Sequence, residues 1–181
     1  MFLTDEEKAR CAYLYRRLAL GVATLSELQE LKLYLIKAIE GVLWYHVHGY
    51  IDVVRLWCRS LTSDFVRRWY FPTNWSWRVA NYACITLDEI EKTSDIVKIY
   101  EILDRFFKLV EGTGISEHEK QFLKALKALR KAKRKSELVI VIDGIIQTLA
   151  HRDISICELI FPPEFMETLD WLREFGYGYR R

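Results

Sequence analysis

The residues of this chain that could do chemistry are concentrated in one basic segment. Residues 112–137 hold eight Lys and Arg against three Asp and Glu, although the whole chain has a formal net charge of only +2. We expect a helix from Ser116 to about Arg134, and at about 100° per residue six cations then share one face of it. They are Lys120, Lys124, Lys127, Lys131, Arg134 and Lys135.

This cationic face has a length suited to a polyanion. From Lys120 to Arg134 it measures about 21 Å at 1.5 Å per residue. A row of ammonium groups can follow a phosphate backbone, because neutralising phosphates releases condensed counterions. The face therefore predicts contact with RNA or DNA. The alternatives are a merely solvated charged face, or contact with an acidic protein or a membrane surface.

A second candidate region mixes aromatic and basic side chains. Its members are Arg67, Arg68, Trp69, Tyr70, Trp75, Trp77 and Arg78. Arginine and aromatic side chains together stack on unpaired bases, and they also dominate the binding energy of protein interfaces. Core packing around a turn at Pro72 is the third interpretation, and the sequence leaves all three open.

Recognisable catalytic signatures are missing from the chain. It has no glycine-rich phosphate loop and no nucleophile elbow, and His151-Arg152-Asp153 lacks the Asn that follows in a kinase catalytic loop. His46 and His48 are two residues apart, which places them on different faces of a helix. We therefore expect no catalytic residue, no metal ligand and no cofactor. An enzyme with a site built from scattered carboxylates and histidines remains a minor alternative.

The spacing of the cysteines and the pattern of apolar residues indicate the cellular compartment of the protein. The four cysteines, Cys11, Cys58, Cys84 and Cys157, form no CxxC pair and have apolar neighbours, so we predict buried thiols in a reducing, cytoplasmic compartment. No signal peptide or bilayer-spanning stretch is evident, and we expect no membrane partner. Gln and Asn are scarce beside Lys, Arg and Glu, which hints at a thermophilic source.

Helix-capping patterns predict an all-α fold. Pairs typical of a capping box occur at Thr4/Glu7, Thr24/Glu27, Thr86/Glu89 and Ser116/Glu119, and Ser94 is a further candidate cap. We predict a single domain, residues 1–181, with about seven to nine helices around one core. Gly112–Gly114 is a candidate joint between subassemblies 1–111 and 115–181.

Three segments are harder to assign. The run Leu138–Ile142 is β-branched, and we assign it to a buried helix because no second strand is evident. The pattern from Thr24 predicts a helix to about Glu40 or beyond, followed by a central helix over residues 44–60 that Gly49 would interrupt. Residues 73–77 are expected to form an irregular link before a helix at 77–84.

Three short stretches in the C-terminal third of the chain resemble a known family. The stretches Asp143–Ala150, Pro162–Phe165 and Trp171–Glu174 resemble the small helical subunit of type III CRISPR effector complexes. The resemblance implies a non-enzymatic accessory subunit that binds along the nucleic acid of an antiviral assembly. Together with the basic face it favours a nucleic-acid-binding or nucleoprotein-assembly protein with a protein partner or homo-oligomer. The alternative is a viral or cellular interaction subunit without nucleic-acid contact.

Overall fold

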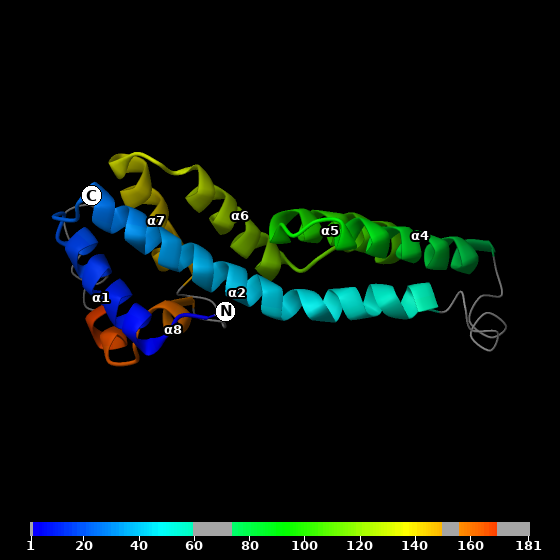
Figure 1. The fold of residues 1–181 in the computed structure, drawn as a ribbon, viewed down its shortest axis with the longest axis horizontal. Coiled ribbons are helices and arrows are strands. Elements are labelled where there is room, and N and C mark those ends of the chain that lie inside the picture. Colours follow the sequence, from blue (N-terminus) through cyan, green and yellow to red (C-terminus); the bar gives the residue numbers. More distant parts are fainter. Residues whose placement is uncertain (1, 60–73, 150–155, 170–181) are drawn as a thin grey trace. The chain divides into compact units, whose positions relative to one another are not determined.

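In the described part of the structure, a computed structural model, all regular secondary structure is helical. The described part covers residues 2–59, 74–149 and 156–169, and no strand occurs among them. The helices are α1 (Asp5–Ala19), α2 (Leu25–Arg59), α4 (Asn74–Glu91), α5 (Ile96–Glu111), α6 (Glu117–Lys131), α7 (Lys135–Leu149) and α8 (Ile156–Ile160) (Figure 1). The prediction of an all-α protein is confirmed. None of the described helices combines the length and the apolar character needed to cross a bilayer.

The chain divides into two compact units. Unit 1 consists of Met1–Val42 and Phe122–Arg181, and unit 2 consists of Leu43–Gln121. The boundaries fall within α2 and α6, so each of these helices contributes to both units. The candidate joint at Gly112–Gly114 lies inside unit 2.

Unit 1 begins with an antiparallel pair formed by α1 and the first part of α2. Both predicted capping boxes at these helix starts are present: the Thr4 and Thr24 hydroxyls accept from the backbone amides of Glu7 and Glu27, and each Glu carboxylate accepts in return. Between the helices, Gly21 has a φ of 75°, which favours glycine and ends α1.

The rest of unit 1 packs around this pair. Figure 1 shows α7 and α8 beside α1 and the first part of α2. The Tyr15 hydroxyl on α1 donates to Asp143 on α7 at 2.8 Å, and the Tyr15 ring contacts Phe161 and Phe165 in one aromatic cluster. The assignment of Leu138–Ile142 to a buried helix is confirmed, because the segment lies within α7.

The long helix α2 corrects one expectation. It runs unbroken for 35 residues. The division into a helix ending after about Glu40 and a separate central helix is therefore wrong, and so is the interruption at Gly49. Successive turns of the helix keep apolar residues on its inner side in unit 2, namely Leu43, Val47, Ile51 and Val54, all of which are buried. Burying this side outweighs the cost of one helical glycine, about 0.5–1 kcal/mol.

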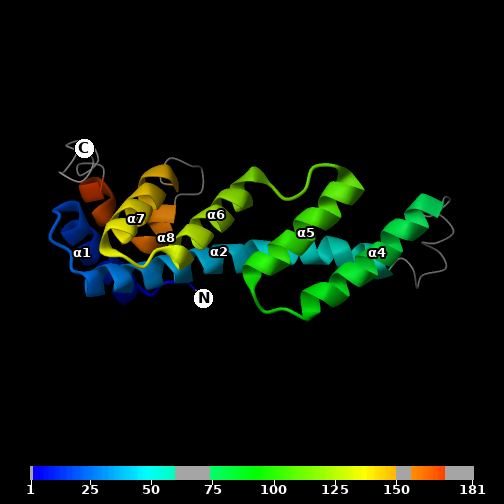
Figure 2. The same ribbon diagram turned by 90° about the horizontal axis from the view of Figure 1, so that it is seen from above.

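In unit 2, α4 and α5 form a hairpin in which the two helices lie side by side (Figure 2). The prediction of an irregular link is wrong for residues 74–77, since α4 begins at Asn74. Thr86 is no cap but a buried residue inside α4, in register with the buried Val79, Ala83 and Ile90. Packing this continuous face against the rest of unit 2 overrides the local capping pattern.

The starts of the next two helices also depart from the expected caps. Asp95, not Ser94, caps α5 by accepting from the Val97 amide at 3.1 Å. At α6 the Ser116 hydroxyl accepts from the Glu119 amide as predicted, at 3.4 Å. The reciprocal bond is replaced, because the Ser116 amide donates to the Tyr50 hydroxyl, which donates to the Glu119 carboxylate.

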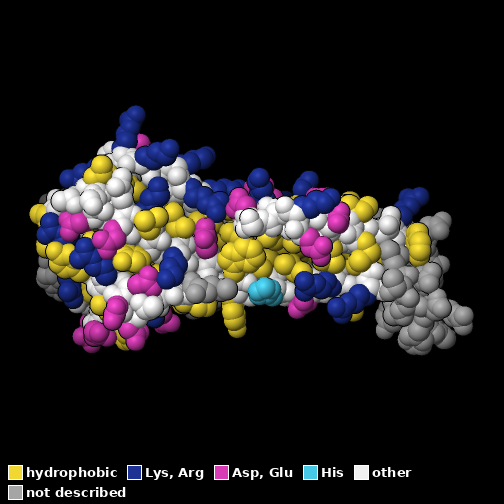
Figure 3. All heavy atoms as spheres, viewed as in Figure 1, with side chains coloured by type: hydrophobic (Ala, Val, Ile, Leu, Met, Phe, Trp, Pro, Cys, Tyr) yellow, Lys and Arg dark blue, Asp and Glu magenta, His cyan; other side chains and the backbone are white. Residues whose placement is uncertain are grey.

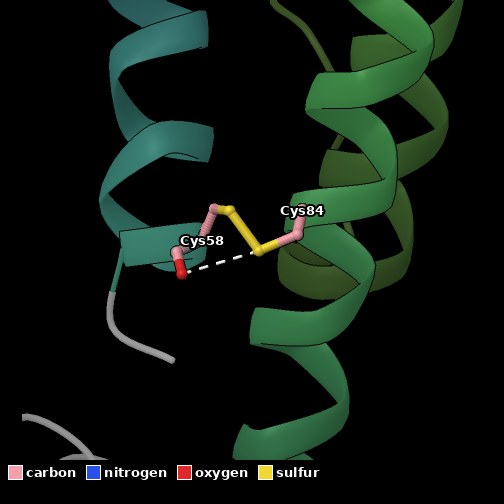
Figure 4. The surroundings of a disulfide bond; sticks show 2 residues. All are labelled: Cys58 and Cys84. Atoms are coloured by element: carbon pink, nitrogen blue, oxygen red, sulfur yellow. Dashed lines mark hydrogen bonds between the residues drawn. A yellow bond between two sulfur atoms is a disulfide. The ribbon is translucent and has the colours of Figure 1, made fainter. Parts of the chain in front are cut away.

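Cysteine pairing contradicts the expectation of four thiols. Cys58 near the end of α2 and Cys84 on α4 form a disulfide, with their Cα atoms 4.7 Å apart (Figure 4). Separate helices bring together two cysteines that are 26 residues apart. Cys11 and Cys157 are buried thiols, as predicted. Burial, with smaller contributions from Glu7 and Glu30, raises the pKa of the Cys11 thiol to about 12.

Candidate nucleic-acid interface

The part of α6 that belongs to unit 1 is strongly two-sided. Phe122, Leu126 and Leu129 are buried in the core. On the other side Lys124, Lys127 and Lys131 are exposed, at spacings of three and four residues. This arrangement matches the one predicted from the sequence, because residues three and four apart lie on one helical face.

The cationic row does not continue along α6 to Arg134. The helix ends at Lys131, and the Lys32 ammonium donates to the Ala132 carbonyl at 2.7 Å. The last carbonyls of a helix have no intrahelical partner, so a cation here stabilises the end. Arg134 instead immediately precedes α7, and its carbonyl accepts from the Leu138 amide. The predicted single helical stripe is therefore wrong in its last turn.

Lys120 has surroundings of its own in unit 2. Its side chain is half-buried. Burial opposes ionisation of Asp104, but Lys108, the Ile115 amide and then Lys120 outweigh it and lower the pKa of that carboxyl. Lys120 thus contributes to the electrostatics of unit 2.

The candidate site includes two further cations that the prediction of one helical face did not contain. Arg130 and Lys133 are exposed, and the turn between α6 and α7 places Lys133 outside any helical face. We call the resulting set the basic cluster: Lys124, Lys127, Arg130, Lys131, Lys133, Arg134 and Lys135. Figure 3 shows Lys and Arg side chains crowding the upper edge of the view over α6 and its connection to α7. Counting charge along the chain, without a helix assumption, would have found both residues.

Two ion pairs in unit 1 join cations of the basic cluster to acidic side chains. Arg130 pairs with Glu40 at 3.2 Å, and Arg134 pairs with Glu137 at 3.5 Å. No Asp or Glu occurs between Lys120 and Ser136. The cluster therefore presents excess positive charge.

Helix dipoles account for some of these cations but not for others. Arg130 and Lys131 lie in the last turn of α6, where positive charge is stabilising. Arg134 and Lys135 lie at the start of α7, where the helix dipole repels a cation. Local helix stability therefore does not explain why the cluster extends across the connection.

The aromatic and basic region is only partly described. Arg67, Arg68, Trp69 and Tyr70 lie outside the described residues, as does the side chain of Trp75. On α4, Trp77 is 47% exposed and Arg78 is also exposed. Trp77 is therefore available for contact with another molecule and is not a core residue.

Apart from the basic cluster, few of the described side chains suggest metal binding or catalysis. No group of three or more His, Cys, Asp or Glu side chains among them is placed to hold a metal ion. His46 is half-buried and packs edge-on against the Tyr45 ring, whereas His48 is exposed. The two rings thus point in different directions from α2, as their spacing predicted.

Comparison of the chain with protein family models, with curated proteins and with solved structures finds no match. Function has to be inferred from the charge and geometry of the basic cluster.

Proposed function

We propose that this protein is a non-catalytic nucleic-acid-binding protein whose basic cluster contacts backbone phosphates. One observation carries the proposal: seven exposed cations occur within the twelve residues Lys124–Lys135, and two of them lie at the helix end where the dipole disfavours them. A polyanion would bring negative charge to this segment, in which no Asp or Glu occurs between Lys120 and Ser136.

The dimensions of the cluster fit a short stretch of strand. Lys124 and Lys131 are seven residues apart on α6, about 10.5 Å along the helix axis. That length equals about three nucleotide steps at 3.4 Å per step along one strand. Arg134 and Lys135 add cations beyond the helix end, so three to five simultaneous phosphate contacts are feasible.

The resemblance to the small subunit of type III CRISPR complexes supports RNA or DNA as the partner and a place within a larger cytoplasmic assembly. Lysine and arginine side chains bind phosphate oxygens irrespective of the base sequence, which suits binding along a backbone. Trp77 and Arg78 offer a second contact, by stacking on an unpaired base or by docking a protein partner.

The disulfide is compatible with a cytoplasmic location if the protein comes from a hyperthermophile. Cytosolic disulfides are rare in mesophiles, whereas intracellular proteins of hyperthermophiles are rich in them. A thermophilic source would therefore reconcile the Cys58–Cys84 bond with a cytoplasmic location.

The salt dependence of binding tests the proposal. Each phosphate contact contributes a slope of about −0.7 on single strands and about −0.9 on duplex DNA to the plot of log affinity against log salt. Three to five contacts predict a slope of roughly −2 to −4. Changing Lys124, Lys127 and Lys131 together to Gln should flatten it by about two to three units, with the helix retained because Gln is a good helix former.

A matched variant separates local contact from overall charge. Changing Lys92, Lys98 and Arg105 to Gln removes the same charge from exposed positions of unit 2, and should leave most of the slope intact. An equal effect of both triple variants would mean non-specific attraction. Absence of binding to any RNA or DNA at low salt would refute the proposal and favour an interaction subunit without nucleic acid.

A further inference from the structure

One serine directly follows the basic cluster. Ser136 comes after Lys135 and is exposed. Five of the six residues before it are Lys or Arg, and no other Ser or Thr occurs between Ser116 and Thr148. Charge is one of the features by which protein kinases distinguish substrates, so a kinase with an acidic substrate groove favours a hydroxyl that is preceded by a run of cations. Ser136 therefore has the surroundings of a phosphate acceptor.

We propose that Ser136 is a phosphorylation site and that its phosphate weakens the binding of nucleic acid by the basic cluster, an effect that rests on the proposed function. The co-reactant is a magnesium-bound nucleoside triphosphate, and the catalyst is a serine/threonine kinase with an acidic substrate groove. The Ser136 Oγ forms a bond to the γ-phosphorus as the bond from that phosphorus to the β–γ bridging oxygen breaks. The nucleoside diphosphate leaves with the electron pair of the broken bond, and the hydroxyl proton passes to a base of the kinase.

A kinase can reach this hydroxyl without unfolding the core. Residues 133–137 are all exposed, and the nearest buried side chains on either side are Ala132 and Leu138. The first two of these exposed residues precede α7, and Ser136 is the second residue of that helix. The first amides of a helix have no intrahelical partner, and helix ends open at little cost in free energy. The chain can therefore extend through Ser136 in a substrate groove while the core stays packed.

Phosphorylation would remove a predictable part of the positive charge. A phosphoserine carries a charge of about −1.5 to −2 at pH 7, which neutralises about two cations. Arg134 already pairs with Glu137 at 3.5 Å, so we assign the neutralisation to Lys133 and Lys135. Losing two phosphate contacts flattens the salt slope by about 1.4 units on a single strand, which corresponds to about 25-fold weaker binding at about 0.1 M salt.

The phosphate would act through its charge and not by unfolding α7. Negative charge in the first turn of a helix is stabilised by the helix dipole, and the first turn of α7 already contains Glu137. The helical signal in circular dichroism should therefore be the same with and without the phosphate.

Full-length chains synthesised with phosphoserine at one position test the effect on binding. Phosphoserine at position 136 should weaken the binding of oligouridine at least about tenfold at about 0.1 M salt. The control is phosphoserine at position 94. Ser94 is exposed and lies in unit 2. Its phosphate adds the same charge away from the basic cluster in the sequence, so it should change the affinity by less than about twofold.

Incubation of the wild type with a kinase of this class and magnesium-ATP tests the acceptor. Ser26 is the matched control, because it is exposed, is the second residue of α2 and is followed by Glu and Leu, as Ser136 is. The six residues before Ser26 contain no charged side chain. Mass spectrometry should therefore locate the phosphate at Ser136 and not at Ser26. Ser136→Ala should abolish that incorporation and leave the affinity for RNA unaltered.

The proposal would be overturned by equal incorporation at Ser26 and Ser136, by loss of helix on phosphorylation, or by phosphoserine at 136 weakening binding no more than phosphoserine at 94. In each of these cases the unmodified chain still binds RNA, and the proposed function stands. Absence of binding by the unmodified chain at low salt would instead refute the proposed function, and the regulation of that binding with it.

Discussion

Breaking the Cys58–Cys84 disulfide should lower the stability of the folded chain by a predictable amount. The bond joins residues 26 apart. In the chain-entropy treatment, a loop of that length removes about 12 cal/mol/K from the unfolded state, or about 3.5 kcal/mol at 25 °C. The same treatment assigns the loss to the unfolded state, because the cross-link restricts the conformations of the unfolded chain.

Urea unfolding followed by circular dichroism measures this difference. With a slope of about 2–3 kcal/mol/M for a chain of this size, the midpoint should fall by about 1–2 M on reduction. The double variant Cys58→Ala, Cys84→Ala should unfold like the reduced protein, and reductant should not affect it further. This variant separates loss of the bond from any other effect of the reductant.

Thiol counting gives an independent reading of the same prediction. Unfolded without reductant, the chain should titrate two thiols, from Cys11 and Cys157, and four after reduction. In the folded state Cys11 should react slowly at pH 8, because its thiol is buried and its pKa is raised to about 12. Four reactive thiols before reduction would refute the disulfide, and an unchanged midpoint after reduction would refute the entropy argument.

Three further changes test individual contacts. Trp77→Ala should lower the free energy of unfolding by less than about 1 kcal/mol, because the side chain is half exposed; a loss of about 3–5 kcal/mol would show a core residue. The hydrogen bond from Arg10 lowers the pKa of Glu30, so this pair stabilises the fold above pH 4.5 and the effect disappears as the pH falls through the lowered pKa. Glu30→Gln should therefore reduce the loss of unfolding free energy in acid by under about 1 kcal/mol, measured from the urea midpoint at several pH values. A variant whose stability depends on pH as the wild type's does would exclude the pair. Gly112→Ala should cost about 1–2 kcal/mol through its positive φ alone. Gly114→Ala should cost more, because its Cβ would displace the Asp104 carboxylate that accepts from the Ile115 amide; equal thermal midpoints would contradict the clash.

Much of this protein could be predicted from its sequence, because local interactions determine it. The caps at Thr4 and Thr24 formed as predicted because a capping box involves only residues three apart. The division of α6 into a buried face with Phe122 and an exposed face with Lys124 followed from helical periodicity alone. The all-α fold and the basic segment were predictable for the same reason.

Tertiary contacts decided the features that the sequence pattern predicted wrongly or did not predict. Thr86 became a buried helical residue because the apolar face of α4 continues through it. α6 ended at Lys131, where Lys32, a hundred residues away in the chain, reaches the Ala132 carbonyl. Cys58 met Cys84 because α2 and α4 approach each other there. Caps and periodicity depend on neighbours within one helical turn, whereas these outcomes depend on which distant helices pack together, and the sequence pattern of one segment does not contain that information.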